Sequence, residues 1–380
     1  MSTIDFKRIN YMKKVLFVTN YPAPYRVKFF NMLGESTDLT VIFEESIKEQ
    51  VHRNKEWFDN DYSRFRAVFL NSKKLGNIQI SFEIIKWLKN KYDIIIVSGY
   101  ASLTTQLCII LLKFMHIPFY MEIDGGYSKS GKGILEYWKK ILISSATKWF
   151  SPSQFSDQYL KFYGAKESRI IRYPFSSLES SDILEKTVSA EEKKIIREQL
   201  GIVEEKVVLT IGQFIPRKAN EVLIEAAKYY ENENIGTYIV GGTPTEEYIQ
   251  LVKKLSLKNI HFVDFKRKDD LKLYYKSADV FAMPTREDIW GLVINEALAN
   301  GLPVVATEKC IAAVELIKEE KNGFLVAVDS PREMGEKIRK LLSDTYECKK
   351  MGKEGLDRIK QYTIEEMVRV HLEAFNIEKE

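Results

Sequence analysis

The chain has 380 residues, of which 45% are hydrophobic and 29% are charged, so it exceeds the usual size of one core and can build two. Its three cysteines are far apart and lack metal-ligand spacing, so we expect no disulfide framework, no metal site and a reducing compartment. The formal net charge is only +4, but residues 1–180 carry 26 Lys and Arg against 17 Asp and Glu, which predicts an anionic partner for that half. This excess of positive charge is spread along the segment, which argues against nucleic acid as the anionic partner.

Buried strands alternate with helices in the N-terminal half. Apolar, β-branched runs predict strands, and the amphipathic or apolar stretches between them predict helices. The predicted strands are residues 14–20, 39–44, 93–98 and 118–124, and the predicted helices are residues 81–90 and 104–115. Continuous apolar strands separated by helices are typical of a parallel, doubly wound sheet.

A polar, serine-rich stretch at residues 176–190 interrupts this pattern and is the best candidate for a linker. A charged helix at 191–200 follows, and then the alternation restarts, with strands predicted at residues 207–212, 237–242, 260–265, 280–285 and 302–307. We therefore predict an α/β protein with two Rossmann-like domains, residues 1–178 and 179–360, that face each other across a cleft. The last part of the chain has helical periodicity over residues 355–378, and we expect residues 361–380 to pack back on the first domain.

The most informative stretch runs from Thr285 to Thr307. Two acids, Glu287 and Asp288, follow a predicted strand, Gly291 opens a helix, and Glu296 lies inside that helix. A helix N-terminus offers unpaired N–H groups and a positive dipole end to a diphosphate, and glycine lets the backbone approach it. A carboxylate one or two turns later can accept two hydrogen bonds from a ribose diol. An ordinary helix with an acidic first turn is the structural alternative.

This stretch resembles glycosyltransferase family 4, whose hallmark is two acids separated by seven residues, as Asp288 and Glu296 are. The resemblance implies the two-domain GT-B fold and a retaining, metal-independent transfer from a nucleotide sugar, with no cofactor. It places the nucleotide sugar in the C-terminal domain and the acceptor in the N-terminal domain.

The same resemblance assigns roles to single residues. Glu296 is expected to bind the nucleotide ribose, and Asp288 is expected to contact the donor sugar as a catalytic residue. The family usually has Glu at the first position, so Glu287 stays open as an alternative catalytic acid. The helix start is expected to contact the donor through Gly291, Leu292 and Val293.

A second candidate site lies at residues 212–220, GQFIPRKAN, directly after a predicted strand. The family has an Arg and a Lys here that hold the diphosphate. Lys218 falls on the Lys position, whereas Gln213 replaces the Arg, and Arg217 is expected to supply the second cation. A basic turn with no ligand is the structural alternative. Weaker family matches add three more donor-site candidates, Gly212, Gly242 and Phe265.

The N-terminal half also carries candidates at strand ends. The loop NYPAPYR, residues 20–26, follows the first predicted strand, and we expect Tyr25 and Arg26 to meet the acceptor or a phosphate. A salt-bridged arginine is the structural alternative. Asp124 follows a predicted strand and is expected to be catalytic, with a capping or turn role as its alternative.

Aromatic and basic residues alternate at residues 132–150, KGILEYWKKILISSATKWF, which can lie in a membrane interface or on the core as a helix with a basic rim. No apolar run reaches the length of a membrane helix, and no secretory leader is visible. We therefore expect a cytoplasmic protein, with peripheral contact at the inner face of the plasma membrane.

Together these observations predict a hexosyltransferase that transfers a sugar from a UDP- or GDP-sugar to a lipid-linked saccharide acceptor. We expect it to act in the biosynthesis of a cell-surface polysaccharide or capsule. Two alternatives stay open: a sugar-nucleotide epimerase on the same fold, and a non-catalytic subunit with a decayed transferase fold. No G-x-G-x-x-G follows either first strand, which disfavours a dinucleotide oxidoreductase.

Overall fold

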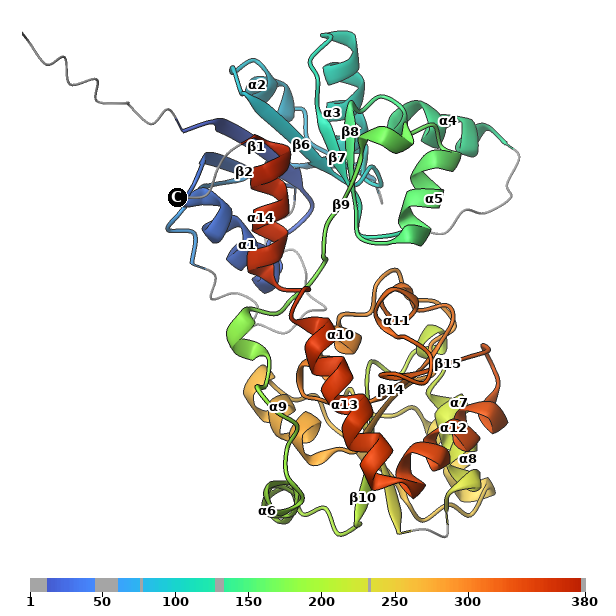
Figure 1. Ribbon diagram of the computed structural model, residues 1–380. Helices are drawn as coiled ribbons and strands as arrows, with labels where there is room; N and C mark the ends of the chain where they lie inside the picture. The colour runs from blue at the N-terminus through green and yellow to red at the C-terminus, as the bar shows by residue number, and fades with distance from the viewer. Residues whose placement is uncertain (1–11, 45–60, 76–77, 127–132, 232–233, 377–380) are drawn as a thin grey trace, which may run out of the picture. The chain divides into compact units, whose positions relative to one another are not determined.

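The computed structural model describes residues 12–44, 61–75, 78–126, 133–231 and 234–376 (Figure 1). The chain divides into two compact units: the first consists of Met1–Phe175 with Ile364–Glu380, and the second of Ser176–Thr363. The domain boundaries expected from the sequence lie within a few residues of these.

Seven parallel strands form the sheet of the first unit, in the order β3-β2-β1-β6-β7-β8-β9. Its central strands are buried on both faces, which explains their continuous apolar sequences. The strands are β1 (Lys14–Thr19), β2 (Asp38–Phe43), β3 (Arg66–Phe69), β6 (Ile94–Ser98), β7 (Tyr120–Glu122), β8 (Lys148–Ser151) and β9 (Ile170–Arg172). A separate antiparallel hairpin joins β4 (Lys73–Leu75) and β5 (Ile78–Ile80).

Helices flank this sheet, and the last helix of the chain is one of them. They are α1 (Pro24–Gly34), α2 (Ile84–Leu88), α3 (Leu103–Phe114), α4 (Ile134–Ile143), α5 (Gln154–Phe162), the 3-10 helix η3 (Glu167–Arg169) and α14 (Ile364–Ala374). α14 lies beside α1 (Figure 1), and the rings of Phe29 and His371 meet there with centroids 4.9 Å apart. The C-terminal segment therefore belongs to the first unit.

Six parallel strands form the sheet of the second unit, in the order β12-β11-β10-β13-β14-β15. The strands are β10 (Lys206–Ile211), β11 (Ile235–Val240), β12 (Ile260–Val263), β13 (Val280–Met283), β14 (Val304–Thr307) and β15 (Gly323–Val326). Its α-helices are α6 (Ala190–Leu200), α7 (Asn220–Ala226), α8 (Glu246–Lys254), α9 (Lys268–Ser277), α10 (Leu292–Ala299), α11 (Ile311–Leu316), α12 (Pro331–Ser343) and α13 (Thr345–Ile359). Short 3-10 helices complete it: η4 (Ser180–Asp182), η5 (Pro216–Lys218) and η6 (Ala227–Tyr229).

The strand order of each sheet reverses beside its first strand, between β1 and β6 in the first unit and between β10 and β13 in the second. Loops that leave the carboxyl ends of two such strands diverge to opposite sides, and ligands of open α/β sheets bind at this point. The second unit places two predicted motifs there, because one follows β10 and the other follows β13.

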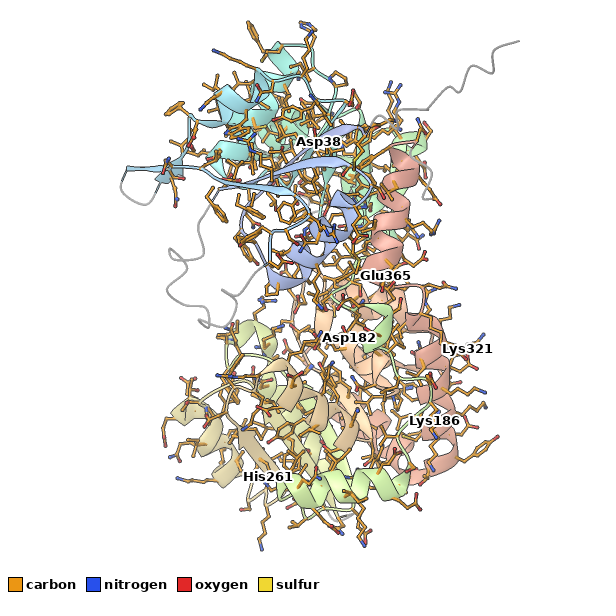
Figure 2. All side chains as sticks on the ribbon, turned by 90° about the vertical axis from the view of Figure 1, so that its left-hand side faces the viewer. Asp38, Asp182, Lys186, His261, Lys321 and Glu365 are labelled. Carbon is orange, nitrogen blue, oxygen red and sulfur yellow. The ribbon has the colours of Figure 1, made fainter. Side chains whose placement is uncertain are left out.

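The predicted linker at residues 176–190 is packed onto the second unit. The Asp182 carboxylate, labelled in Figure 2, lies 3.0 Å from the ammonium groups of both Lys268 and Lys272. The Leu184 amide donates a hydrogen bond to the Ala299 carbonyl at 3.0 Å. Polar contacts hold this segment in place. Because the residues that make such contacts are polar, the sequence shows no hydrophobic periodicity here, and the segment was predicted as a linker.

Two predicted helical stretches are each divided in the structure. The stretch at 355–378 contains the end of α13 and all of α14, separated at Lys360–Thr363. The aromatic-basic stretch at 132–150 begins as α4 but ends in β8, where Trp149 is only 2% exposed and belongs to the core. Lys132 lies outside the described residues. The predicted strand at 260–265 ends at Val263, so Phe265 lies beyond it.

Candidate functional site

The loops after β10 and β13 meet at the carboxyl edge of the second sheet. Thr285 Oγ1 and the Arg286 amide each donate a hydrogen bond of 2.9 Å to the Arg217 carbonyl. Arg217 Nη1 in turn donates to the Glu287 carbonyl at 2.8 Å. Two motifs some seventy residues apart in the sequence are thus joined into one surface.

An ion pair links the predicted phosphate-binding lysine to the predicted sugar-binding acid. Lys218 Nζ lies 2.5 Å from Asp288 Oδ2, and the two side chains are 17% and 14% exposed. Arg217 Nη1 lies 3.5 Å from the same oxygen. The structure therefore separates the two neighbouring acids: Asp288 faces both cations, whereas the Glu287 side chain is exposed to solvent.

Gly291 precedes α10 in a left-handed conformation, with φ +99°. A Cβ at this position would lie 2.7 Å from Cys310 Sγ, so a larger residue would be both strained and crowded. Leu292 and Val293, which form the start of α10, are half-buried. The first N–H groups of the helix thus lie three to five residues beyond Asp288 and are not used within the helix.

Glu296 lies inside α10 and is half-buried. Tyr275 on α9, which is 2% exposed, donates a hydrogen bond of 2.8 Å to Glu296 Oε2. Burial raises the pKa of Glu296, and this hydrogen bond opposes the rise. The sequence analysis did not find Tyr275, because a tyrosine on a helix that precedes a buried strand is most simply explained as a core residue.

The remaining donor-site candidates lie along the same edge of the sheet. A Cβ on Gly241 would lie 1.8 Å from the Gly212 carbonyl oxygen, which shows how closely the ends of β10 and β11 approach. Gly242 has φ +113° and open space around it. Gln213 is exposed, and so is Phe265, whose side chain is 56% exposed.

Arg26 lies at the start of α1, where it forms the ion pair that the sequence analysis left open as its alternative role. Its side chain is buried, and Nη1 lies 2.6 Å from Glu122 Oε1 on β7. The guanidinium is therefore paired inside the unit, which corrects the expectation that Arg26 contacts an acceptor. Tyr25 is half-buried against the Phe175 ring, with centroids 5.8 Å apart, while Asp124 follows β7 and is exposed.

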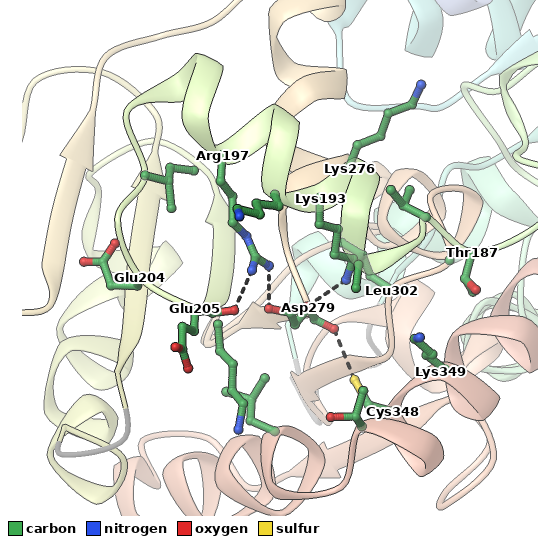
Figure 3. Close-up of a pocket in the computed structure, with 18 of the residues that line it drawn as sticks. Thr187, Lys193, Arg197, Glu204, Glu205, Lys276, Asp279, Leu302, Cys348 and Lys349 are labelled. Atoms are coloured by element: carbon green, nitrogen blue, oxygen red, sulfur yellow. Dashed lines mark hydrogen bonds and ion pairs between the residues drawn. The ribbon is translucent and has the colours of Figure 1, made fainter.

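A cavity of about 760 Å³ lies elsewhere in the second unit, among the residues that precede β10, β13 and β14. Lys193 and Arg197 line it and pair with the Asp279 carboxylate, each at 2.7 Å (Figure 3). Both cations also donate to the carbonyls that end α9. These ion pairs support the fold, and none of the predicted site residues lines this cavity.

Comparison with known proteins identifies related sequences and a related fold. Residues 192–358 match the family described as glycosyl transferases group 1. An uncharacterized glycosyltransferase, MJ1607, of Methanocaldococcus jannaschii is 34% identical over 161 residues, which are 41% of this chain and 41% of that protein. A D-inositol 3-phosphate glycosyltransferase of Corynebacterium glutamicum is 30% identical over 180 residues, which are 44% of this chain and 42% of that protein. The matches thus span about two fifths of the length of these relatives.

The solved structure of Anabaena HepE in complex with UDP resembles the whole chain. The TM-score is 0.76 at 17% sequence identity, and the match covers 96% of this chain and 99% of that protein. The likeness confirms the predicted fold: the protein has the two parallel-sheet α/β domains of the GT-B fold.

Proposed function

We propose that the protein is a glycosyltransferase that moves a sugar from a UDP- or GDP-sugar to a saccharide acceptor. The observation that carries this proposal is the meeting of Lys218, Arg217 and Asp288 beside the N-terminus of α10. The family match over residues 192–358 covers these residues, and the HepE structure contains UDP, both of which support a nucleotide-sugar donor.

In this proposal, the second unit binds the donor. Lys218, Arg217 and the first N–H groups of α10 hold the diphosphate, while Glu296 binds the ribose through the oxygen that Tyr275 does not occupy. Asp288 contacts the donor sugar. The bond between the anomeric carbon and the diphosphate oxygen breaks, and the two cations stabilise the negative charge that develops on the leaving nucleoside diphosphate.

The reaction is proposed to retain the anomeric configuration and to need no metal. A short-lived ion pair forms, and the acceptor hydroxyl then attacks from the face that the diphosphate leaves. Its proton passes to the departing phosphate oxygen. Lys218, Arg217 and the α10 N-terminus supply the positive charge that a metal ion supplies in other transferases.

We further propose a lipid-linked saccharide as the acceptor, with the protein held peripherally at the membrane during synthesis of a cell-surface polysaccharide. Support comes from α4, which exposes Ile134, Leu135 and Tyr137 at 84%, 72% and 67% next to the exposed Lys140. Apolar side chains this exposed beside a lysine suit a membrane interface. No helix among the described residues is long and apolar enough to cross a membrane.

The test is release of nucleoside diphosphate from UDP-, GDP- and ADP-sugars, measured together with donor binding. We expect the protein to turn over one of these donors. Glu296→Ala should reduce this turnover about 100-fold at subsaturating donor, because the carboxylate that binds the ribose is removed. Glu308→Ala removes an exposed carboxylate after β14 and serves as the control. A donor that binds wild type and Glu296→Ala equally, with no release from either, would instead support a non-catalytic subunit.

A further inference from the structure

The two cations that are proposed to bind the diphosphate already face a carboxylate. Asp288 Oδ2 lies 2.5 Å from Lys218 Nζ and 3.5 Å from Arg217 Nη1. A diphosphate that approaches these cations must therefore compete with Asp288 for them. The pair is mostly shielded from solvent, which makes the interaction stronger than that of an exposed surface pair.

The backbone on both sides of the pair is fixed, so the competition takes place between side chains. The Asp288 amide donates to the Lys309 carbonyl at 2.9 Å, and the Asp288 carbonyl accepts from the Ile311 amide at 3.2 Å. The Lys218 amide donates to the Ile215 carbonyl at 2.9 Å within the turn η5. The flexible four-carbon stem of Lys218 can turn its ammonium group from one anion to another without moving the loop.

We propose that Asp288 is the resting counter-ion of the diphosphate-binding cations, and that diphosphate binding draws Lys218 away and frees the Asp288 carboxylate for the donor sugar. This inference rests on the proposed function and adds that diphosphate binding is coupled to the release of the Asp288 carboxylate. The diphosphate carries more negative charge than one carboxylate, so it displaces Asp288 from the two cations. Because it must do so, the diphosphate binds more weakly than it would if Asp288 were absent. The carboxylate becomes available only when a donor is present.

The proposal predicts that removing the charge of Asp288 strengthens the binding of a nucleoside diphosphate, although Asp288 belongs to the binding site. If Asp288 only supported the loop or only contributed favourable contacts, removing its charge would weaken or leave unchanged the binding of a nucleoside diphosphate. If Asp288 competes for Lys218, the same change strengthens that binding. Transfer of the sugar is nevertheless reduced, because the carboxylate that contacts the sugar is lost. Nucleotide affinity and turnover should therefore move in opposite directions.

The experiment measures the affinity of the full chain for UDP, GDP and ADP by isothermal titration calorimetry. The variants are Asp288→Asn, Lys218→Met and the double variant, and circular dichroism checks that each is folded. We expect Asp288→Asn to tighten binding of the preferred nucleotide about 3- to 10-fold and Lys218→Met to weaken it about 10-fold. In the Lys218→Met background, Asp288→Asn should give a clearly smaller gain, because Lys218 is no longer there to be released.

Glu308→Gln is the matched control, because it removes one negative charge from the same edge of the sheet at an exposed side chain. If Glu308→Gln tightens binding as much as Asp288→Asn does, the effect is one of overall charge and the inference fails. If Lys218→Met weakens binding but Asp288→Asn does not tighten it, the inference fails while the proposed donor site stands. If no nucleotide binds the wild type, both the proposed function and the inference fail.

Discussion

At the scale of single residues, Glu296 depends on a neighbour that the motif does not contain. Tyr275 comes from α9 and fixes one oxygen of the Glu296 carboxylate at 2.8 Å. A long carboxylate side chain without this partner could adopt several rotamers, and binding a ribose would then require ordering it. In the proposed donor site, Tyr275 is a positioning residue, because it would act on the nucleotide through Glu296.

Replacing Tyr275 with Phe should raise the KM for the donor about 10-fold with a smaller change in kcat, because a hydrogen bond to a charged group is lost. The pH dependence gives a second measurement. Burial raises the pKa of Glu296 and the Tyr275 hydrogen bond lowers it, so the variant has the higher pKa. Nucleotide binding needs the ionised carboxylate and should therefore be lost at a higher pH, as the pH falls, than in the wild type.

Tyr230→Phe is the control for this prediction. The Tyr230 hydroxyl is also buried in the second unit and lies 3.0 Å from Thr237 Oγ1, away from the candidate site. Tyr230→Phe should lower the stability of the protein about as much as Tyr275→Phe does, but it should leave the pH dependence of nucleotide binding unchanged. An identical shift in both variants would indicate a general loss of packing.

At the scale of elements, a buried charge cluster joins α1, β7 and α14 in the first unit. Glu122 on β7 is fully buried; one oxygen lies 2.6 Å from Arg26 Nη1 and the other lies 3.4 Å from His371 Nε2. The Tyr173 hydroxyl lies 3.4 Å from the Glu122 oxygen that faces Arg26, and the Asp124 carboxylate interacts electrostatically with Arg26. Burial alone would raise the pKa of Glu122, but Arg26 and His371 lower it to about 2.

This cluster predicts an acid-sensitive contribution to stability. The folded pKa of Glu122 lies below its usual value of 4.5, so the contribution is complete above that pH and is lost as the pH falls towards about 2. Glu122→Gln should reduce the free energy of unfolding by about 3 kcal/mol at pH 7 and by clearly less at pH 3. Denaturant unfolding at the two pH values measures this difference. Equal losses at both would show that the carboxylate charge is not what stabilises the cluster.

At the scale of the whole molecule, the net positive charge lies in residues 1–180, where 26 Lys and Arg stand against 17 Asp and Glu, and the same residues contain the exposed apolar side chains of α4. We expect the protein to bind phosphatidylglycerol-containing vesicles at low salt and to be released as salt screens the charges. Ile134→Ser with Leu135→Ser should weaken this binding about 10-fold, because two apolar side chains no longer enter the interface. Vesicle co-sedimentation measures both effects.

Val203→Ser provides the control, because Val203 in the second unit is 84% exposed, as is Ile134. It should leave vesicle binding unchanged. If wild type does not bind anionic vesicles at low salt, the proposed membrane contact is wrong, whereas the proposed donor site is unaffected.

The sequence by itself determined the α/β class, the central strands of both sheets and the order of the residues that are proposed to bind the donor. These features are local: a strand buried on both faces needs a continuous apolar run, as in Val15–Val18, and a glycine such as Gly291 marks a backbone turn. The edge strands β3 and β9, which are short and only partly buried, were missed, and so was the edge strand β15, whereas the edge strand β12 was predicted at residues 260–265. The packed segment at 176–190 was missed because polar contacts fix it.

Only the tertiary structure decided which charged groups are paired. Arg26 and Glu122 are 96 residues apart in the sequence and form a buried pair, so a predicted ligand-binding arginine became part of the core. Lys218 and Asp288 are 70 residues apart and form the pair on which the proposed switch rests. The physical reason is that charge pairing depends on distance in space, whereas a sequence records neighbours along the chain. The parallel sheet brings distant strand ends together and so creates the site.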